Sequence, residues 1–192
     1  MNLIRKKIKF DKKLIDQDAL KIVKKMTNSG YETYLVGGCI RDILLGHKPK
    51  DFDIATSATP EQINKLFKRS RIIGRRFKLV HIMFSARKFI EVATFRAGNL
   101  KTSSDGLVLR DNYYGTLKDD VFRRDFTVNG LYYDINKSEV IDYVGGLKDL
   151  EILKINMIGD PSERFEEDPV RMIRAVRFQA KLNAKIEPRL IE

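Results

Sequence analysis

The chain has 192 residues, of which 37 are lysine or arginine and 26 are aspartate or glutamate, so its formal net charge is +11. Hydrophobic residues make up 43%, too many for a disordered chain, while 33% charged residues exclude an integral membrane protein. The surplus of positive charge favours a polyanionic partner, nucleic acid above all, although a basic protein without such a partner has the same composition.

Cysteine usage and targeting signals narrow the class of protein further. The single cysteine, Cys39, has no partner for an internal disulfide, and together with two histidines it is too little for a structural zinc site. No run of about 18 uncharged apolar residues is present, and the basic segment 1–13 lacks the apolar core of a secretory signal. We therefore expect a cytoplasmic location and no membrane contact, and we infer no stable protein partner.

Periodicity, capping residues and turn signals predict the elements of the fold. In chain order they are a helix from residue 15 that ends near 28–30, a strand at 31–36, a helix after the glycines at 37–38, a helix that begins at Thr59, a hairpin of strands at 79–84 and 89–95, a helix start at 116–120, a hairpin of strands at 131–134 and 140–143, and a helix over 169–182.

The segment 97–115 is rich in Gly, Ser, Asn and Asp, and it predicts a long loop, which in a compact domain is usually functional or mobile. The helix at 169–182 has an apolar face with little sequence after it to cover that face. We therefore expect this sequence to be the N-terminal portion of something longer. The sum of these elements predicts a mixed α/β domain followed by a helical segment.

Two acids suggest metal chemistry. Asp51 and Asp53 are two residues apart, which on a strand puts both carboxylates on one face, with Phe52 and Ile54 packed on the other. Such close carboxylates repel each other unless a cation lies between them, and hard oxygen ligands favour Mg²⁺ or Mn²⁺. Most isolated Asp-x-Asp pairs are solvated loop acids. Glu91, inside an apolar strand, would complete a three-carboxylate site or would be an ordinary solvent-facing acid.

The glycine pair Gly37-Gly38 adds a candidate phosphate site. It allows close approach of the backbone, and the helix that follows offers free N–H groups to an anion. Arg41, one turn into that helix, can reach the same anion. Taken alone, an ordinary strand–helix turn is the more common role of such a pair. Two metal ions held by the neighbouring acids would support phosphoryl or nucleotidyl transfer.

Four motifs in a fixed order resemble one enzyme family. They are Gly-Gly-x-x-Arg-Asp at 37–42 with Asp-x-Asp at 51–53, the segment 123–129, the segment 142–150 and the segment 167–171. This set resembles class II nucleotidyltransferases of the polymerase-β-like superfamily, which are the bacterial poly(A) polymerases and the CCA-adding tRNA nucleotidyltransferases. The resemblance implies an α/β (α+β) head with a mixed β-sheet flanked by helices at 1–155, and the start of a helical neck at 156–192.

The resemblance also implies catalytic roles. Asp51 and Asp53 would hold Mg²⁺, with Mn²⁺ as an alternative, and Glu91 would complete or support the site. Asp125 would join the catalytic set, where it would orient Arg124, contact the ribose or assist the metal. A helix-terminus cap is the plainer role for Asp125.

By the same resemblance, ATP would be the substrate. The nucleotide-binding residues would be Gly37, Gly38, Arg41, Arg124, Asn129, Asp168, Arg171, Arg174 and Arg177. Asp168 and Arg171 would read the edge of the base, because aspartate supplies acceptors and arginine a rigid fork of donors. Arg171, Arg174 and Arg177 form one stripe on the helix, for which a solvated charged face is the usual explanation. Asn129 would contact the sugar or triphosphate, or only fix a turn.

Three further stretches favour the poly(A) branch of the family. They are residues 72–82, residues 109–112 and the pair Tyr132-Tyr133. Within the first stretch, His81 would neighbour the base pocket or be a satisfied strand histidine. The reaction expected from the resemblance is attack of an RNA 3′-hydroxyl on the α-phosphate of ATP, with release of pyrophosphate and no template. The alternatives are CCA addition to tRNA and a basic RNA-binding module without catalysis. The acid pair at 51 and 53 argues against the second of these.

Overall fold

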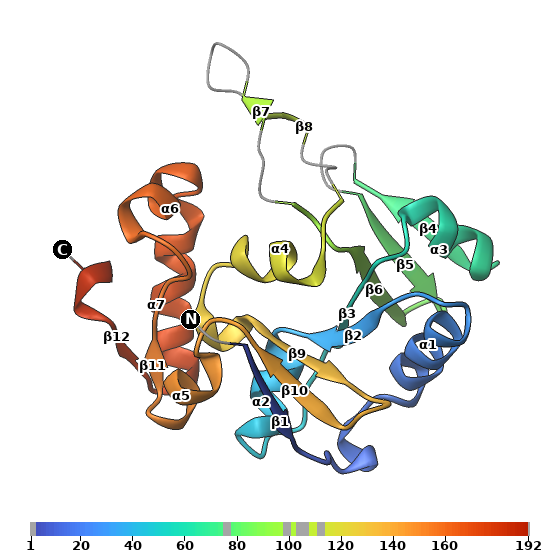
Figure 1. Cartoon of the computed structure of the whole chain (residues 1–192), viewed down its shortest axis with the longest axis horizontal. Helices are drawn as coiled ribbons and strands as arrows, with labels where there is room; N and C mark the ends of the chain where they lie inside the picture. The colour runs from blue at the N-terminus through green and yellow to red at the C-terminus, as the bar shows by residue number, and fades with distance from the viewer. Residues whose placement is uncertain (1–2, 75–77, 98–100, 103–107, 111–113, 192) are drawn as a thin grey trace.

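The computed structural model shows a mixed β-sheet with helices on both of its faces (Figure 1). The structure describes residues 3–74, 78–97, 101–102, 108–110 and 114–191. In this part of the chain the main sheet has eight strands, in the order β1 (Ile4–Lys7), β10 (Glu139–Asp142), β9 (Leu131–Asp134), β2 (Thr33–Val36), β3 (Asp53–Thr56), β6 (Phe89–Thr94), β5 (Leu79–Met83) and β4 (Ser70–Ile73).

The register of the sheet determines which acids share a face. Neighbouring strands run antiparallel except β3 and β6, which are parallel. Asp53 is the register partner of Glu91 on β6 and of Val36 on β2. Because register partners point to the same side of a sheet, Asp53 and Glu91 lie on one face. The expected strand begins at Asp53, so Asp51 precedes it instead of belonging to it.

Helices and short strands complete the described chain. The α-helices are α1 (Gln17–Asn28), α2 (Gly38–Leu44), α3 (Pro60–Leu66), α4 (Leu117–Phe122), α5 (Gly146–Glu151), α6 (Pro161–Glu167) and α7 (Val170–Leu182). The 3₁₀ turns are η1 (Lys12–Leu14), η2 (Thr127–Asn129) and η3 (Pro188–Leu190). Two short ribbons are formed by β7 (Lys101–Thr102) with β8 (Val108–Arg110) and by β11 (Lys154–Ile155) with β12 (Lys185–Ile186).

The sheet separates two apolar clusters, as strand alternation requires. On one face, Leu35 and Ile54 pack with the buried sides of α1, α2 and α3. On the other face, Tyr34 and Tyr132 pack with Val121 of α4. In β3 this alternation buries Ile54 in the first cluster and leaves Asp53 on the side of α4. Phe52 is also buried in the first cluster, so the expected packing side of this segment is confirmed.

Local sequence signals predicted many of these elements, although β1, β4, α5 and α6 were not among them. The helices expected from residue 15, after the glycines at 37–38, from Thr59, from 116–120 and over 169–182 are confirmed, with the first beginning at Gln17, and both hairpins are confirmed. Capping boxes occur where Thr59 pairs with Gln62 and where Thr116 pairs with Asp119. The expected loop at 97–115 includes the ribbon of β7 and β8, and its residues 98–100, 103–107 and 111–113 lie outside the described structure, as do 75–77 of the stretch that favoured the poly(A) branch.

The C-terminal segment packs against the sheet domain (Figure 1). The strand β11 pairs in parallel with β12, and Phe126 forms an isolated bridge with Met157. The outer face of α7 is apolar and open to solvent, with Ile173 70% exposed and Val176 59% exposed. The apolar face that the sequence predicts on this helix is therefore exposed in the described structure. The division of the chain into a head and a neck after residue 155 stays a prediction. No helix in the described residues is long and apolar enough to cross a bilayer.

A tight turn joins β10 to α5. One oxygen of Asp142, Oδ1, accepts hydrogen bonds from the backbone N–H groups of Val144, Gly145 and Gly146, at 2.9–3.1 Å. The other oxygen, Oδ2, accepts one from Leu147 at 2.9 Å. Asp142 is buried, and these bonds satisfy its charge. The segment 142–150, which resembles a family motif, therefore has a defined structural role.

We expect the substitution Gly146→Ala to destabilise the fold strongly. A Cβ at this position would lie 2.1 Å from the carbonyl oxygen of Thr127, which is backbone and cannot rotate away. Overpacking of this kind costs roughly 3 kcal/mol in the free energy of unfolding, measured by urea titration. The matched control is Gly46→Ala, where a Cβ meets nothing within 4 Å and the φ of +78° adds only backbone strain. Equal losses for both variants would contradict the steric argument.

Candidate active site

The turn between β2 and α2 brings the backbone close to a guanidinium. Gly37 has φ +71° and ψ −130°, a conformation that side chains disfavour. A Cβ placed on Gly37 would lie 3.4 Å from Nη1 of Arg124. Gly38 begins α2, and a Cβ there would lie 3.4 Å from Nη2 of Arg41. The glycine pair therefore leaves two guanidinium groups next to bare backbone.

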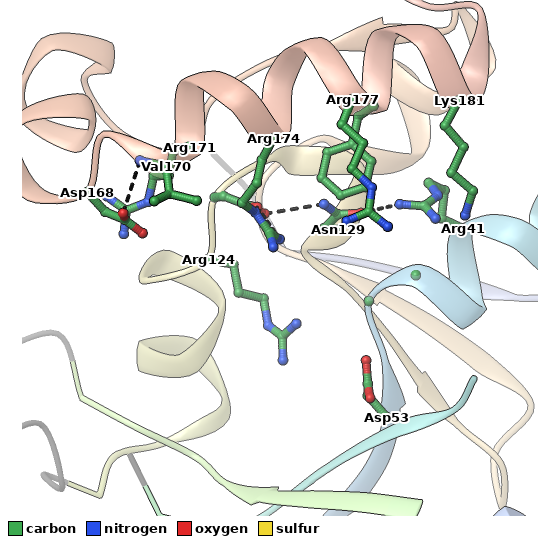
Figure 2. Close-up of a pocket in the computed structure, with 14 residues that line it drawn as sticks. Arg41, Asp53, Arg124, Asn129, Asp168, Val170, Arg171, Arg174, Arg177 and Lys181 are labelled. Carbon is green, nitrogen blue, oxygen red and sulfur yellow. Dashed lines mark hydrogen bonds and ion pairs between the residues drawn. The ribbon is translucent and has the colours of Figure 1, made fainter. Parts of the chain in front are cut away.

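These groups open onto a cavity of about 550 Å³ between the sheet and α7 (Figure 2). Its lining consists of Gly37, Gly38, Arg41, Asp53, Arg124, Asp125, Asn129, Asp168, Val170, Arg171, Arg174, Arg177, Phe178 and Lys181. Figure 2 shows Arg174, Arg177 and Lys181 reaching down from α7 toward the glycine turn, with Asp53 on the opposite side. Cations outnumber carboxylates in this lining, which suits a polyphosphate.

The other two predicted acids lie in an adjoining cavity of about 570 Å³. It is lined by Asp51, Asp53 and Glu91, together with the cations Arg87 and Lys88. Asp53 lines both cavities, so it stands between the space beneath α7 and the space at the end of the sheet. All the predicted catalytic and nucleotide-binding residues thus line one of these two cavities, which share Asp53.

The charge state of Asp53 reflects this crowding. Burial against the cleft walls raises the pKa of the Asp53 carboxyl, although one side stays open to solvent, and the nearby carboxylates of Glu91 and Asp51 raise it further. Arg124 acts in the opposite direction. A carboxyl whose pKa is raised by neighbouring carboxylates fits a divalent cation, which removes the repulsion. Among the described residues, no group of three His, Cys, Asp or Glu side chains converges on one point, and a metal held by Asp51 and Asp53 stays a prediction.

Glu91 has a partner of its own. Its carboxylate lies 3.2 Å from Nε2 of His81, and the His81 ring stacks on Phe89 at 4.2 Å between centroids. His81 is therefore held on β5 beside Glu91, which is the strand-histidine alternative, and it does not line the cavity beneath α7. A role for Glu91 as a third carboxylate of the site stays a prediction.

Four side chains connect the glycine turn to α7 (Figure 2). Nη1 of Arg41 donates to Oδ1 of Asn129 at 2.6 Å. Nδ2 of Asn129 in turn donates to Oδ1 of Asp125 at 3.3 Å. Oδ2 of Asp125 accepts from Nε of Arg174 at 2.7 Å. Asp125 was expected to orient Arg124, but its carboxylate bonds Arg174 instead. A contact of Asp125 with the ribose or the metal stays a prediction, and Asn129 links Arg41 to Asp125 in addition to lying in a turn.

We expect Asn129→Ala to weaken ATP binding more than it weakens the fold. The variant removes the hydrogen-bonded link between Arg41 and Asp125. Nη1 of Arg41 loses its partner, so the guanidinium is held by fewer bonds, those to Asp42 at 2.7 and 2.9 Å. An affinity loss of about tenfold, measured by calorimetry with ATP, corresponds to roughly 1.4 kcal/mol. The control is Asn136→Ala, in the turn between β9 and β10, outside the cavity. Unchanged ATP affinity in Asn129→Ala would contradict a positioning role.

Arg124 is held by a buried cluster beneath the cavity. Its Nε donates to the Tyr132 hydroxyl at 2.6 Å, and its Nη2 lies 3.1 Å from Oδ2 of Asp120. The Tyr132 hydroxyl also bonds Asp120, and Nε of Arg123 reaches the same carboxylate at 3.0 Å. Burial would raise the pKa of Asp120, but Arg124 and Arg123 outweigh it and hold that pKa below its usual value. Burial raises the pKa of Tyr132.

The residues expected to read the base line the cavity but are engaged elsewhere. Oδ1 of Asp168 accepts from the backbone N–H of Val170 at 3.2 Å. Nη1 of Arg171 donates to the carbonyl of Arg164 at 2.5 Å and to Glu167 at 2.9 Å. The two side chains do not bond each other in this structure. Neighbouring acids neutralise two of the stripe arginines, Arg171 and Arg174.

Sequence reasoning missed three residues that line the cavity, Val170, Phe178 and Lys181. The Phe178 ring lies between the guanidinium carbons of Arg41, 5.2 Å from its centroid, and Arg174, 5.5 Å away. Nζ of Lys181 lies 3.0 Å from Oδ2 of Asp42. The available signal was spacing, because positions 171, 174, 178 and 181 follow the i, i+3, i+7 and i+10 pattern of one helix face.

A mixed sheet with an acid at a strand start, a glycine turn and a basic helix over one cleft is the architecture of a polymerase-β-like nucleotidyltransferase head. The family model described as the poly A polymerase head domain matches residues 33–156. The chain therefore belongs to the poly(A) polymerase head domain family, which confirms the resemblance drawn from the motifs.

Individual relatives support the same family. The chain is 51% identical over 192 residues to poly(A) polymerase I of Salmonella typhi, covering 95% of this chain and 41% of that protein. It is 39% identical over 172 residues to a CCA-adding enzyme of Bacillus pumilus, covering 88% of this chain and 41% of that protein. A crystal structure of the Bacillus stearothermophilus CCA-adding enzyme with CTP matches with a TM-score of 0.75 and 36% identity, covering 91% of this chain and 41% of that one. The chain thus spans about two fifths of these relatives.

Proposed function

We propose that the protein transfers AMP from ATP to the 3′ end of RNA without a template and releases pyrophosphate. The observation that carries the proposal is the position of Asp53 between two cavities, one lined by cations and the glycine turn and one that opens at the end of the sheet. Such an arrangement provides separate sites for a triphosphate and for the hydroxyl that attacks it. Catalysis would rest mainly on positioning and electrostatics.

In this proposal the chain's own residues bind and orient ATP. Arg41 and Arg124 neutralise the triphosphate beside the bare backbone of Gly37 and Gly38. The cations of α7 close the cavity from the other side and exclude water. The ring of Phe178 keeps Arg41 in place.

Asp51 and Asp53 would hold the divalent cation, Mg²⁺ or Mn²⁺, and the raised pKa of Asp53 fits such a role. Bound there, the metal would supply a lowered pKa for the attacking hydroxyl and charge neutralisation at the phosphates. Asp53 itself, which lines both cavities, orients the two substrates toward each other.

Base selection requires a rearrangement of Arg171. Its guanidinium contacts Glu167 and a backbone carbonyl, so reading adenine means exchanging these partners for the base edge. Asp168, at the end of α6, has one carboxylate oxygen that accepts no hydrogen bond within the described chain and is available to the base. Aspartate and arginine together match the donor and acceptor edge of adenine.

The choice of AMP addition over CCA addition is supported by similarity. The relatives named poly(A) polymerase I, such as that of Salmonella typhi at 51% identity, are closer than the CCA-adding enzymes at 36–39%. CCA addition remains the alternative because the matched solved structures include CCA-adding enzymes. We place the activity in the cytoplasm, where RNA 3′ ends and ATP are available.

The test is nucleotide incorporation by the purified protein with Mg²⁺. We expect radiolabelled AMP to be added to an oligoadenylate primer, and CTP to be ignored even when the primer is a tRNA that lacks its CCA end. Incorporation of both CTP and ATP on the tRNA would favour CCA addition. Binding of RNA with no incorporation of either nucleotide would favour the RNA-binding module, although such a module has no use for repelling carboxylates at 51 and 53.

A further inference from the structure

A second basic surface lies on the side of the sheet opposite α4. Between α1, the end of α3 and the end of β5 there is a cavity of about 490 Å³, here named the α1–α3 hollow. Its floor is apolar and comes from Ile22, Leu66, Ile82 and Met83. None of these residues takes part in the cleft that contains Asp53.

Cations surround this apolar floor without acids between them. The rim consists of Lys21, Lys25, Lys65, Lys68 and Arg69, and the lining contains no aspartate or glutamate. Lys21 pairs with Asp18 at 2.9 Å, and Nζ of Lys25 donates to the Leu66 carbonyl at 2.6 Å. Lys65, Lys68 and Arg69 make no ion pair with any described residue. A cluster of unneutralised cations repels itself and attracts a polyanion.

Two aromatic rings lie within the same rim. Phe67 and Phe84 line the hollow and are half-buried, so each keeps part of its ring open to solvent. The ammonium of Lys25 lies 4.7 Å from the centroid of Phe67, and that of Lys88 lies 5.8 Å from the centroid of Phe84. Partly exposed rings alternating with lysines are the elements that bind single-stranded nucleic acid, with bases on rings and phosphates on cations.

The hollow adjoins the catalytic acids through the turn between β5 and β6. Because β5 ends where β6 begins, and β6 runs parallel to β3, this turn lies at the end of the sheet where Asp53 is found. Arg87 and Lys88 of the turn line the cavity that contains Asp53. Lys88 also reaches Phe84 of the hollow. One path therefore leads from Asp53, past Lys88, into the α1–α3 hollow.

We propose that the α1–α3 hollow binds the single-stranded RNA that lies upstream of the 3′ end held at Asp53. This inference rests on the proposed function and adds a binding site on the head for that same substrate. Bases stack on Phe84 and Phe67, and phosphates contact Lys65, Lys68 and Arg69. Asp16, which also lines the path, is neutralised by Lys88 at 2.8 Å and so does not repel the strand.

The alternative occupant is an acidic protein segment, which the same charges would attract. Continuity with the cavity of Asp53 favours RNA. An RNA whose 3′ end lies at Asp53 must extend away from it along this end of the sheet, whereas a protein partner has no reason to lie there. The aromatic rings also favour RNA, since bases stack on such rings whatever the RNA sequence.

The test compares RNA of two lengths on a charge-reversal variant. Lys65→Glu with Lys68→Glu changes two exposed side chains outside the cleft, and Lys6→Glu with Lys9→Glu is the control, with the same spacing of three residues and the same change in net charge. The probes are fluorescein-labelled oligoadenylates of about 4 and about 16 nucleotides, which bracket the usual site sizes for single strands. Affinity is measured by anisotropy over a range of salt concentrations.

We expect the Lys65/Lys68 variant to bind the long oligoadenylate about tenfold less tightly than the control variant, with a salt slope shallower by about 1.4, since each lost phosphate contact removes about 0.7. Binding of the short oligoadenylate should match the control. Equal affinity of both variants for the long RNA overturns the proposal. So does a variant that loses only the binding of a glutamate-rich peptide, which would assign the hollow to a protein partner.

A second measurement keeps this test separate from that of the proposed function. A photoreactive 4-thiouridine placed upstream in the long oligoadenylate should crosslink to the peptides that contain Phe67 and Phe84, with or without nucleotide incorporation. Crosslinks confined to other peptides overturn the proposal. Failure of AMP incorporation alone would count against the proposed function and leave this binding result intact.

Discussion

We expect Asp53→Asn to reduce the proposed nucleotide transfer strongly and, at the same time, to stabilise the protein in the absence of metal. Loss of the carboxylate removes the residue that lies between the two cavities and that would hold the cation, so AMP incorporation should fall by about 10³-fold. ATP affinity without metal should change little, because the cations of the cleft are intact. Incorporation that survives in Asp53→Asn would contradict the catalytic assignment.

The stability effect follows from the direction of the pKa shift. The folded pKa of Asp53 lies above its ordinary value of 3.8, so between these two values the folded state binds more protons than the unfolded state, and stability falls as the pH rises through that window. At neutral pH the carboxylate therefore costs stability that asparagine does not. We expect a modestly higher Tm for Asp53→Asn at pH 7, because solvent at the exposed side of Asp53 weakens the effect. The difference should disappear in acid below the unfolded pKa, and adding Mg²⁺ should raise the Tm only in the parent protein.

Asp18, at the start of α1, provides a control because its pKa is shifted in the opposite direction to that of Asp53. Hydrogen bonds from Lys88 and Lys21 hold the pKa of Asp18 below its ordinary value. Its ionised form therefore stabilises the fold above the unfolded pKa, and this contribution is lost as the pH falls through the folded pKa. Asp18→Asn should lower the Tm at pH 7, although modestly, because the pair is at the surface. A lower Tm in both variants would contradict the argument from crowded carboxylates.

The parts of the site that the sequence predicted are those set by neighbours in the chain. Gly37 occupies a left-handed turn and Thr59 pairs with Gln62 because short-range sterics and capping decide these geometries. The order of four motifs then identified the family. Strand alternation placed Ile54 in the core and Asp53 on the open side, although the strand starts two residues later than the spacing of the acids suggested.

The parts that the sequence left open depend on contacts between distant segments. Asp125 carries no local sign of whether it orients Arg124 or Arg174, since Arg174 lies 49 positions along the chain and meets it only after α7 packs on the sheet domain. Glu91 also depends on a contact between separate strands, because the register of β5 and β6 places His81 opposite it. Phe178 was not singled out in the sequence, and only folding places it between two guanidiniums.

The buried acid Asp120 was equally hidden, because in the sequence it lies in the first turn of a helix, where acids are common and exposed. In the structure it is 1% exposed and sits below two arginines and Tyr132. This burial makes Arg124 both a candidate phosphate ligand and the counterion of a carboxylate. The two roles can be separated by substitution.

We expect Arg124→Met to destabilise the fold and to weaken ATP binding. Removing one member of a buried ion pair leaves the other charge uncompensated, so the free energy of unfolding should fall by about 3 kcal/mol even though Arg123 remains. ATP affinity should fall because a cation next to the glycine turn is lost. Urea unfolding followed by circular dichroism gives the first quantity, and calorimetry with ATP gives the second.

The double variant Arg124→Met with Asp120→Asn decides between the two roles. Neutralising Asp120 removes the buried charge that Arg124 balanced, so most of the lost stability should return, whereas ATP affinity should stay low. The matched control is Arg123→Met, which removes the other guanidinium on Asp120 but does not line the cavity, so it should cost stability and leave ATP affinity unchanged. If the double variant regained ATP affinity, Arg124 would act on the nucleotide only by keeping Asp120 neutralised, and direct contact with phosphate would be wrong.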